Sequence, residues 1–312
     1  MSEQIAYLNG EYLRLEDARV PVLDRGFIFG DGVYEVIPVY AGKPLRLAAH
    51  LQRLARSLAA IKLPNPHTDE EWAQLLAELV KRHPWADQSI YLHITRGVAP
   101  RNHAFPAVTK PTVFMMSGPL KLPSAEERSA GVRTLSLEDF RWQRCDIKSI
   151  ALLGNCLLRQ AAVEAGCKEA VLFRDGWLTE GAASNIFVIE NGTLLAPPID
   201  HLILPGITYE ITLELAHQHG MPVKVAPISE AQTRQADELW LTSSTNEVLA
   251  ITELDGHPVG SGRPGPAWRQ MSEWFEAFKR DLRSGAEGVA SAGVTRAGAP
   301  VEAALAGTPA AG

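Results

Sequence analysis

Short turn dipeptides divide this chain into antiparallel strand pairs, and they restrict its fold more than any other feature. Asn9-Gly10, Asp175-Gly176 and Asn191-Gly192 each stand between two runs with the pattern of short strands. Such dipeptides favour the tight turns that join the two strands of a hairpin. Helical and strand patterns also follow one another without a regular strand–helix–strand order. The sequence therefore predicts an α+β fold with mixed sheets and packed helices, and not a doubly wound parallel sheet.

The 312 residues are enough for two medium-sized domains with substantial cores. We expect a smaller N-terminal α+β domain over 1–117 and a larger C-terminal domain over 126–283. Two prolines and a glycine lie close together in 118–125, and this composition indicates a linker. The last residues, 284–312, are mostly alanine, glycine, valine and small polar residues without an apolar period, which predicts a disordered tail.

Apolar periodicity predicts the elements within each domain. The expected strands of the first domain lie at 33–40, 89–96 and 112–117, and its expected helices lie at 47–61 and 68–80. In the second domain the expected helices lie at 149–165, 206–219 and around 268–282, and further strands are expected at 238–242 and 248–254.

Composition argues against several classes of protein. The net charge of −6 speaks against an extended basic surface for nucleic acid. The first residues lack a basic segment followed by an apolar run, and no apolar run is long enough to span a bilayer. No C-x-x-C spacing, which disulfide or zinc sites often use, occurs among Cys145, Cys156 and Cys167. A metal pair is also not expected from His217 and His219, which point to different sides of a helix. We therefore expect a cytoplasmic protein without a disulfide framework, a metal site or a membrane anchor.

Lys148 and Glu180 are the most informative candidates for chemistry. A lysine amine can form a Schiff base with an aldehyde cofactor, and a carboxylate can pair with the ring nitrogen of that cofactor. Lys148 precedes a helix expected to begin at Ser149, so burial and the positive helix end would favour the neutral amine. Glu180 ends a short strand before Gly181 and two alanines, whose small size could leave a cavity open. For a lysine taken at random, an exposed side chain is the commoner outcome.

One loop and two polar runs could bind anions. Arg101 and His103 lie in a loop stiffened by prolines and offer several donors to a carboxylate, although many basic loops are simply solvated. Leu204-Pro205-Gly206-Ile207-Thr208 opens a helix, whose first N–H groups can bind an anion. Thr242-Ser243-Ser244-Thr245 adds hydroxyl groups, which elsewhere more often cap helices or fill turns. Together with Arg53, the two runs would form a phosphate site.

Four motifs in this order resemble the fold type IV pyridoxal-phosphate enzymes, which comprise the branched-chain aminotransferases, the D-amino-acid aminotransferases and the aminodeoxychorismate lyases. They are Arg25-Gly26-Phe27-Ile28-Phe29-Gly30-Asp31-Gly32-Val33-Tyr34-Glu35, then Lys148, then Thr179-Glu180-Gly181-x-x-Ser184-Asn185, then Leu204-Pro205-Gly206-Ile207-Thr208. The resemblance extends from Tyr7 to Leu282. Within the family, Thr95-Arg96-Gly97 and the run around Arg101 and His103 are similar to the D-amino-acid aminotransferases.

This resemblance implies roles for the candidate residues. Lys148 would bind pyridoxal 5'-phosphate and move the substrate proton, and Glu180 would keep the ring nitrogen protonated. The phosphate would be held by Arg53, Ile207, Thr208, Ser243 and Ser244, the ring would pack on Leu204, and the substrate α-carboxylate would be held by Tyr34, Arg101 and His103. The family is typically homodimeric, with the site near the domain and subunit boundaries. Tyr209 stands where many relatives have arginine, and Ser244 stands where threonine is common.

The activity implied by the resemblance is that of a D-amino-acid transaminase. Such an enzyme transfers the amino group from D-alanine and other D-amino acids to 2-oxoglutarate or pyruvate in a ping-pong reaction. A branched-chain L-amino-acid or amine transaminase is the first alternative, and aminodeoxychorismate lyase is the second. A catalytically silent binding protein is a third, against which the intact pair of Lys148 and Glu180 argues.

Overall fold

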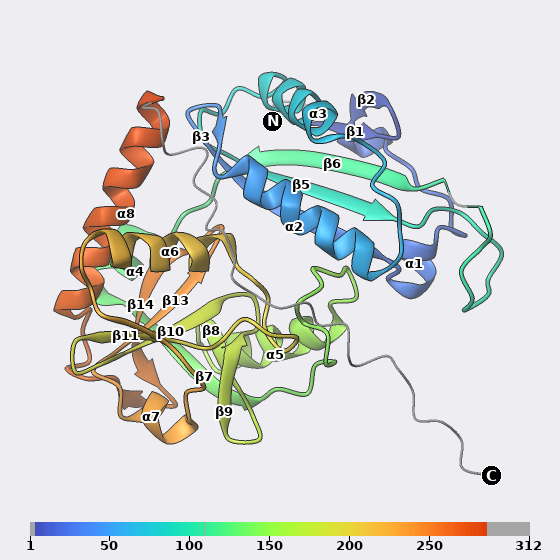
Figure 1. Ribbon diagram of the computed structural model, residues 1–312. Coiled ribbons are helices and arrows are strands. Elements are labelled where there is room, and N and C mark those ends of the chain that lie inside the picture. The colour runs from blue at the N-terminus through green and yellow to red at the C-terminus, as the bar shows by residue number, and fades with distance from the viewer. Residues whose placement is uncertain (1–3, 109, 286–312) are drawn as a thin grey trace, which may run out of the picture.

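The computed structural model describes residues 4–108 and 110–285, and their strands form two sheets (Figure 1). The connection between the two halves is shorter than the predicted linker, because β6 (Thr112–Pro119) continues to Pro119 and α4 (Ala125–Ala130) begins at Ala125. The predicted tail begins too early. Ser284 is the last residue of α8 (Pro266–Ser284) and Gly285 caps that helix, whereas 286–312 lie outside the described residues.

The N-terminal sheet is antiparallel throughout, in the order β2-β1-β6-β5-β3-β4. Its strands other than β6 are β1 (Ile5–Leu8), β2 (Glu11–Arg14), β3 (Gly32–Tyr40), β4 (Lys43–Pro44) and β5 (Gln88–Thr95). The helices α2 (Leu47–Ala60) and α3 (Asp69–Lys81) bury their apolar faces against the core of this sheet, and α2 lies on the side that faces the second half of the chain (Figure 1).

The C-terminal sheet is mixed, in the order β12-β11-β10-β13-β14-β7-β8-β9, with β15 paired to β14. Its strands are β7 (Val132–Glu138), β8 (Glu169–Arg174), β9 (Trp177–Gly181), β10 (Asn185–Glu190), β11 (Thr193–Ala196), β12 (Val223–Val225), β13 (Glu238–Ser243), β14 (Glu247–Leu254) and β15 (His257–Pro258). β7 runs parallel to both β14 and β8, and the hairpins supply antiparallel pairs. The prediction of an α+β fold with mixed sheets is confirmed.

The helices of this half are α4, α5 (Leu153–Glu164), α6 (Ile207–Gln218), α7 (Glu230–Arg234) and α8. α6 and α8 pack side by side over one face of the sheet, where Trp240, Met271 and Phe275 belong to one buried cluster. No helix in the described ranges has the length and apolar character that a bilayer span requires.

The three predicted hairpins are present, with a positive φ at both turn residues. Asn9 and Gly10 have φ values of 52° and 106°, and Asp175 and Gly176 have values of 51° and 78°. Asn191 repeats the arrangement with a φ of 50°. These are the left-handed conformations that Asn, Asp and Gly tolerate best.

The prediction for α5 was wrong at its start and on its face. The helix begins at Leu153 and not at Ser149, so Lys148 does not lie at a helix N-terminus. The apolar face was predicted to hold Ile150, Leu153, Leu157 and Leu158, but Leu153 and Leu157 are exposed, and the helix packs through Leu158 and Ala162. Residues 149 and 150 bond instead to the start of β3, where Ser149 forms a bridge to Val33 and the Ile150 N–H donates to the Gly32 carbonyl at 3.1 Å. The helix dipole therefore makes no contribution to the basicity of Lys148.

Candidate active site

A cavity of about 560 Å³ lies between α2 and β3 of the N-terminal half and the sheet of the C-terminal half. This volume is in the usual range for small-molecule sites. The predicted site residues that line it are Tyr34, Arg53, Lys148, Glu180, Leu204, Ile207, Thr208, Ser243 and Ser244. The fold thus brings these separate runs together around one space.

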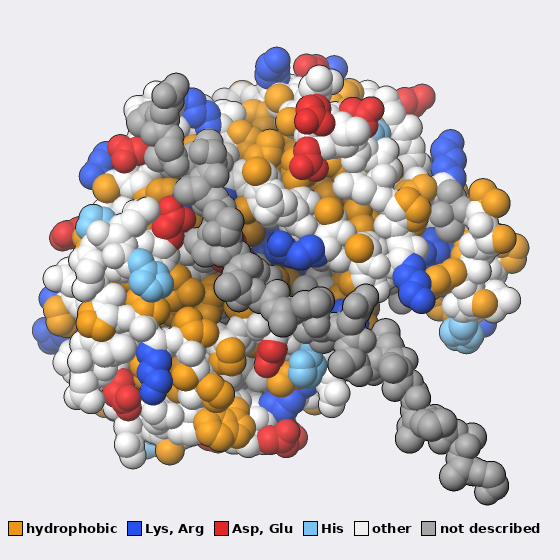
Figure 2. Space-filling view, in the orientation of Figure 1, with side chains coloured by type: hydrophobic (Ala, Val, Ile, Leu, Met, Phe, Trp, Pro, Cys, Tyr) orange, Lys and Arg blue, Asp and Glu red, His pale blue; other side chains and the backbone are white. Residues whose placement is uncertain are grey.

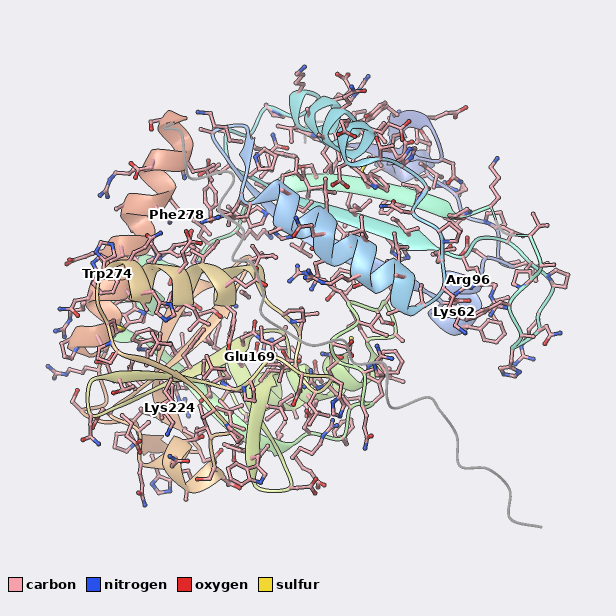
Figure 3. The ribbon with its side chains drawn as sticks, viewed as in Figure 1. Lys62, Arg96, Glu169, Lys224, Trp274 and Phe278 are labelled. Carbon is pink, nitrogen blue, oxygen red and sulfur yellow. The ribbon has the colours of Figure 1, made fainter. Side chains whose placement is uncertain are left out.

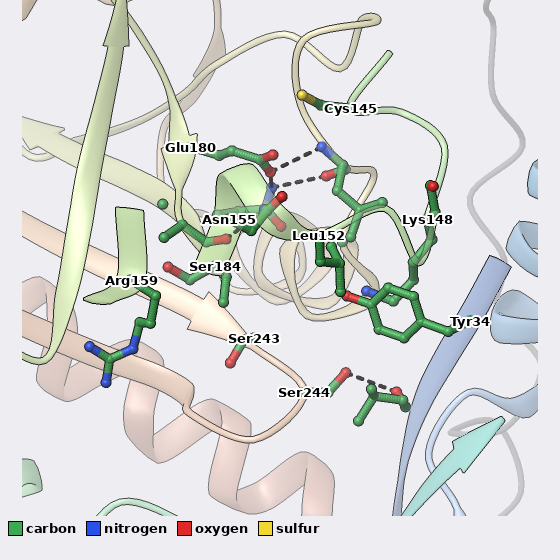
Figure 4. Close-up of a pocket in the computed structure, with 18 of the residues that line it drawn as sticks. Tyr34, Cys145, Lys148, Leu152, Asn155, Arg159, Glu180, Ser184, Ser243 and Ser244 are labelled. Atoms are coloured by element: carbon green, nitrogen blue, oxygen red, sulfur yellow. Dashed lines mark hydrogen bonds between the residues drawn. The ribbon is translucent and has the colours of Figure 1, made fainter. Parts of the chain in front are cut away.

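Lys148 is half-buried at one side of this cavity, beside Tyr34 (Figure 4). Its Nζ lies 4.3 Å from the centre of the Tyr34 ring. The backbone is fixed on both sides, because the Lys148 N–H donates to Ser57 Oγ at 3.2 Å and its carbonyl accepts from the Tyr34 N–H at 2.9 Å. Burial, and then the positive charge of Arg53, lower the pKa of the Lys148 amine to about 8. The neutral form of the Lys148 amine is therefore more accessible near neutral pH than that of an exposed lysine.

Glu180 is buried at the opposite side of the cavity in a network of donors (Figure 4). One carboxylate oxygen accepts from the Leu204 N–H at 3.0 Å and from Asn185 Nδ2 at 3.2 Å. The other accepts from Arg141 Nη1 at 2.6 Å. Burial raises the pKa of Glu180 to about 7, although Arg141 opposes that rise. With a pKa of about 7, the carboxyl group can share a proton with a nitrogen base of similar pKa.

Arg141 belongs to this site, and the sequence did not single it out. Its guanidinium is buried, donates through Nε and Nη2 to both oxygens of Asp139 at 2.9 and 2.8 Å, and keeps Nη1 for Glu180. Asp139 also accepts from Thr179 Oγ1 at 2.9 Å. Asp139 thus holds the guanidinium in the orientation in which it meets Glu180.

A second buried ion pair fixes Arg53. Its Nε and Nη2 donate to the two oxygens of Glu35 at 2.8 and 2.7 Å, and Nη1 donates to the Pro205 carbonyl at 2.9 Å. His50 Nδ1 lies 2.8 Å from the same carboxylate. Although burial raises it, the ion pair with Arg53 holds the pKa of Glu35 far below its usual range. A fixed positive charge is therefore placed against the start of the run that leads into α6.

The start of α6 and the end of β13 meet at one end of the cavity and present N–H and hydroxyl groups to it. Gly206 precedes the helix without a side-chain cap, so the first N–H groups of α6 have no partner within the helix. A Cβ on Gly206 would lie 2.0 Å from Asn185 Oδ1, so only glycine fits here. Thr242 Oγ1 is buried, lines the cavity, and is without a hydrogen-bond partner among the described residues. An orphaned hydroxyl of this kind fits a ligand with acceptor oxygens.

Tyr209 does not line this end of the cavity. Its ring is buried and stacks on Phe187 with centroids 4.8 Å apart, and its hydroxyl donates to the Pro197 carbonyl at 2.8 Å. The residue that departs from many relatives therefore points into the core beneath α6.

Arg101 and His103 are not brought to the cavity of their own chain. Both are exposed on the loop between β5 and β6, which projects from the end of the N-terminal sheet (Figure 1). Figure 2 shows hydrophobic side chains gathered on this projecting loop. The Arg101 guanidinium and the His103 ring lie 5.6 and 5.3 Å from the ring centre of Phe29. In the described part of the chain, no cluster of His, Cys, Asp and Glu has the arrangement of a metal site.

The chain is similar to known aminotransferases over most of its length. It is 38% identical to D-alanine aminotransferase of Staphylococcus epidermidis, in a match that covers 87% of this chain and 96% of the relative. It is 40% identical to D-alanine aminotransferase of Bacillus licheniformis, covering 84% and 93%. The solved branched-chain amino acid aminotransferase of Escherichia coli superposes with a TM-score of 0.84 at 25% identity, covering 88% and 94%. Residues 32–254 match the amino-transferase class IV family model, and the chain belongs to that family of enzymes.

Proposed function

We propose that this enzyme is a pyridoxal-phosphate-dependent D-amino-acid transaminase that uses D-alanine and other D-amino acids with 2-oxoglutarate or pyruvate. The observation that carries the proposal is the composition of one cavity. Lys148 and Glu180 line it on opposite sides, and Arg53, the start of α6 and hydroxyl groups line one end of it. The names of the relatives from Staphylococcus epidermidis and Bacillus licheniformis support D-alanine as a substrate.

The residues of the cavity fit each part of pyridoxal 5'-phosphate. Lys148 suits the aldehyde, Glu180 suits the ring nitrogen, and Leu204 offers an apolar contact to the ring. The phosphate would be held by Arg53, the first N–H groups of α6 at Ile207 and Thr208, and the hydroxyls of Ser243, Ser244 and Thr242. When bound, this cofactor supplies an aldehyde for the amino group and a ring that withdraws electrons from the substrate Cα.

The protein supplies the proton transfers. The Lys148 amine, whose pKa is lowered to about 8, would act as the general base that takes the proton from Cα of the amino acid. Glu180 would keep a proton on the ring nitrogen of the cofactor, and burial raises the pKa of its carboxyl group to about 7. Arg141 prevents burial from driving that pKa higher.

In this proposal, a second copy of the chain completes the binding site for the substrate carboxylate. Arg101 and His103 are the proposed carboxylate ligands, yet both lie outside the cavity of their own chain. Large apolar side chains are exposed beside them, including Phe27, Val108 and Phe105. Monomers rarely leave such a patch uncovered. We therefore place the loop of one copy over the cavity of the other in a homodimer, with Tyr34 contributing from the cavity itself.

Absorbance of the cofactor tests the substrate class. Purified holoenzyme should lose its visible band on mixing with D-alanine much faster than on mixing with L-leucine. A faster reaction with L-leucine would instead assign the chain to the branched-chain enzymes. Pyruvate release from aminodeoxychorismate without an amino acceptor would assign it to the lyases.

Mixing two inactive variants tests the shared site. Arg101→Ala and Lys148→Ala are each expected to be inactive with D-alanine at low substrate concentration. After subunit exchange, a mixed dimer contains one cavity with both native residues, so about a quarter of all sites should regain activity. If no activity returns although mixed dimers form, Arg101 and Lys148 serve the cavity of one and the same chain, and the shared site is wrong.

A further inference from the structure

The motif Arg25–Asp31 is not explained by the cavity, because Arg25 is buried and does not line it. Arg25 begins α1 (Arg25–Phe29), a short helix that the sequence did not predict and that is capped by the side chain of Asp24. Its Nε donates to Asp31 Oδ2 at 2.7 Å, and the same carboxylate binds Arg96 through two further hydrogen bonds at 2.8 and 3.0 Å. Two guanidinium groups thus share one carboxylate beneath the loop between β5 and β6.

The remaining donors of Arg25 point at the backbone of that loop. Nη1 donates to the carbonyl of Asn102 at 2.5 Å and to that of Ala104 at 3.4 Å, and Nη2 donates to that of His103 at 3.4 Å. The side chains of Arg101 and His103 meanwhile remain exposed. One buried cation therefore holds the loop by its carbonyl groups and leaves its side chains available.

Aromatic contacts and the base of the loop complete the attachment. The Phe105 ring centre lies 3.6 Å from the Arg96 guanidinium and 5.8 Å from that of Arg25. Arg96 is itself anchored to the end of α2, where it donates to the Lys62 carbonyl at 3.2 Å (Figure 3). At the start of the loop, the Arg25 N–H donates to the Gly97 carbonyl at 2.9 Å. Gly97 has a φ of 85°, and a Cβ there would lie 2.0 Å from the Lys110 carbonyl oxygen.

We infer that Arg25 is a positioning residue for the substrate carboxylate, acting through the loop that carries Arg101 and His103. A loop already fixed in its binding conformation does not lose conformational entropy when the carboxylate arrives, so the substrate binds more tightly. A lysine at position 25 cannot reproduce this, because an ammonium lacks the planar fork that reaches a carboxylate and several carbonyl groups at once. The inference rests on the proposed function, since it needs Arg101 and His103 to bind that carboxylate.

The test compares two amines that differ only in the carboxylate. D-alanine carries it, and D-alaninol has a hydroxymethyl group in its place. The second-order rate constant for loss of the visible band is measured with each amine in the holoenzyme and in Arg25→Lys, Phe105→Ala, Arg101→Ala and Arg82→Lys. Phe105 is half-exposed, so its variant should fold even if Arg25→Lys does not. Arg82 is the matched control, because it lies on the same domain, pairs with Glu78 and does not contact the loop.

Arg25→Lys and Phe105→Ala should lower the rate constant with D-alanine by on the order of tenfold or more and leave that with D-alaninol nearly unchanged. Saturating D-alanine should restore most of the rate, and backbone amides at 101–105 should exchange hydrogen faster. Arg82→Lys should behave as the native enzyme. If Arg101→Ala loses the preference for D-alanine while both loop-anchor variants keep it, the inference is overturned and the proposed function stands. If Arg101→Ala keeps that preference, the proposed carboxylate site and the inference fail together.

Discussion

Replacing Arg141 with methionine should both destabilise the protein and shift its activity to higher pH. The substitution leaves Asp139 and Glu180 buried without the guanidinium that now lies 2.8 and 2.6 Å from them. Breaking a buried ion pair by removing one partner costs about 3–5 kcal/mol. Arg141 is also the main group that lowers the pKa of Glu180, so its loss should raise that pKa above about 7, by about 1–3 units for a charge at this distance.

The two effects are measured separately. Denaturant unfolding of the apoprotein gives the change in stability, and the pH profile of kcat/KM with D-alanine gives the position of the acid limb, which should move upward. Arg144→Met is the matched control from the same run, because Arg144 is exposed and pairs with the partly exposed Asp146. It should change stability by less than about 1 kcal/mol and leave the pH profile in place. An Arg141→Met enzyme with native stability and an unmoved acid limb would refute the reasoning.

Three further predictions follow from the same site. Thr242→Val should leave the apoprotein as stable or stabilise it by about 1 kcal/mol in denaturant unfolding, yet weaken binding of the cofactor in titrations, because the lost hydroxyl has no protein partner. Gly206→Ala should destabilise the fold by about 1–3 kcal/mol and weaken cofactor binding, because its Cβ would displace Asn185; native affinity would contradict this. In the apoprotein, Glu180 binds more protons folded than unfolded between pH of about 4.3 and 7, so stability should fall as pH rises through that window. Lys148 binds fewer protons in the folded than in the unfolded state between pH of about 8 and 10.4, so the free energy of unfolding should rise with pH in that window. Glu180→Gln should remove the pH dependence of the free energy of unfolding in the lower window only, and Lys148→Met should remove it in the upper window only.

The parts of the fold that could be predicted depend on local chemistry. The Asn9-Gly10 turn specifies its hairpin within a few residues, and Thr68 with Glu71 forms the capping box that starts α3. α5 shows the limit of such reasoning. Ile150 continues the apolar pattern of the helix, but its N–H donates to the Gly32 carbonyl and Ser149 forms a bridge to Val33, and no local signal in the sequence indicates that pairing.

The candidate site divides in the same way. Residue type made Lys148 and Glu180 candidates, the resemblance to the fold type IV enzymes implied their roles, and the fold brings them to one cavity. Arg141 could not be found, because its value lies in contacts with Asp139 and Glu180 that only the folded chain creates. Arg101 could be singled out as an anion ligand from its loop, but the sequence alone did not show that its own chain keeps it away from the cavity.

Reduction of the holoenzyme with borohydride tests the central claim most directly, because it makes the bond between the cofactor and its lysine permanent. Digestion and mass spectrometry should then find the added pyridoxyl-phosphate mass on the peptide that contains Lys148, with nothing on other lysines, and the label should be absent from Lys148→Ala. A label on another lysine, or undiminished labelling of Lys148→Ala, would contradict the account.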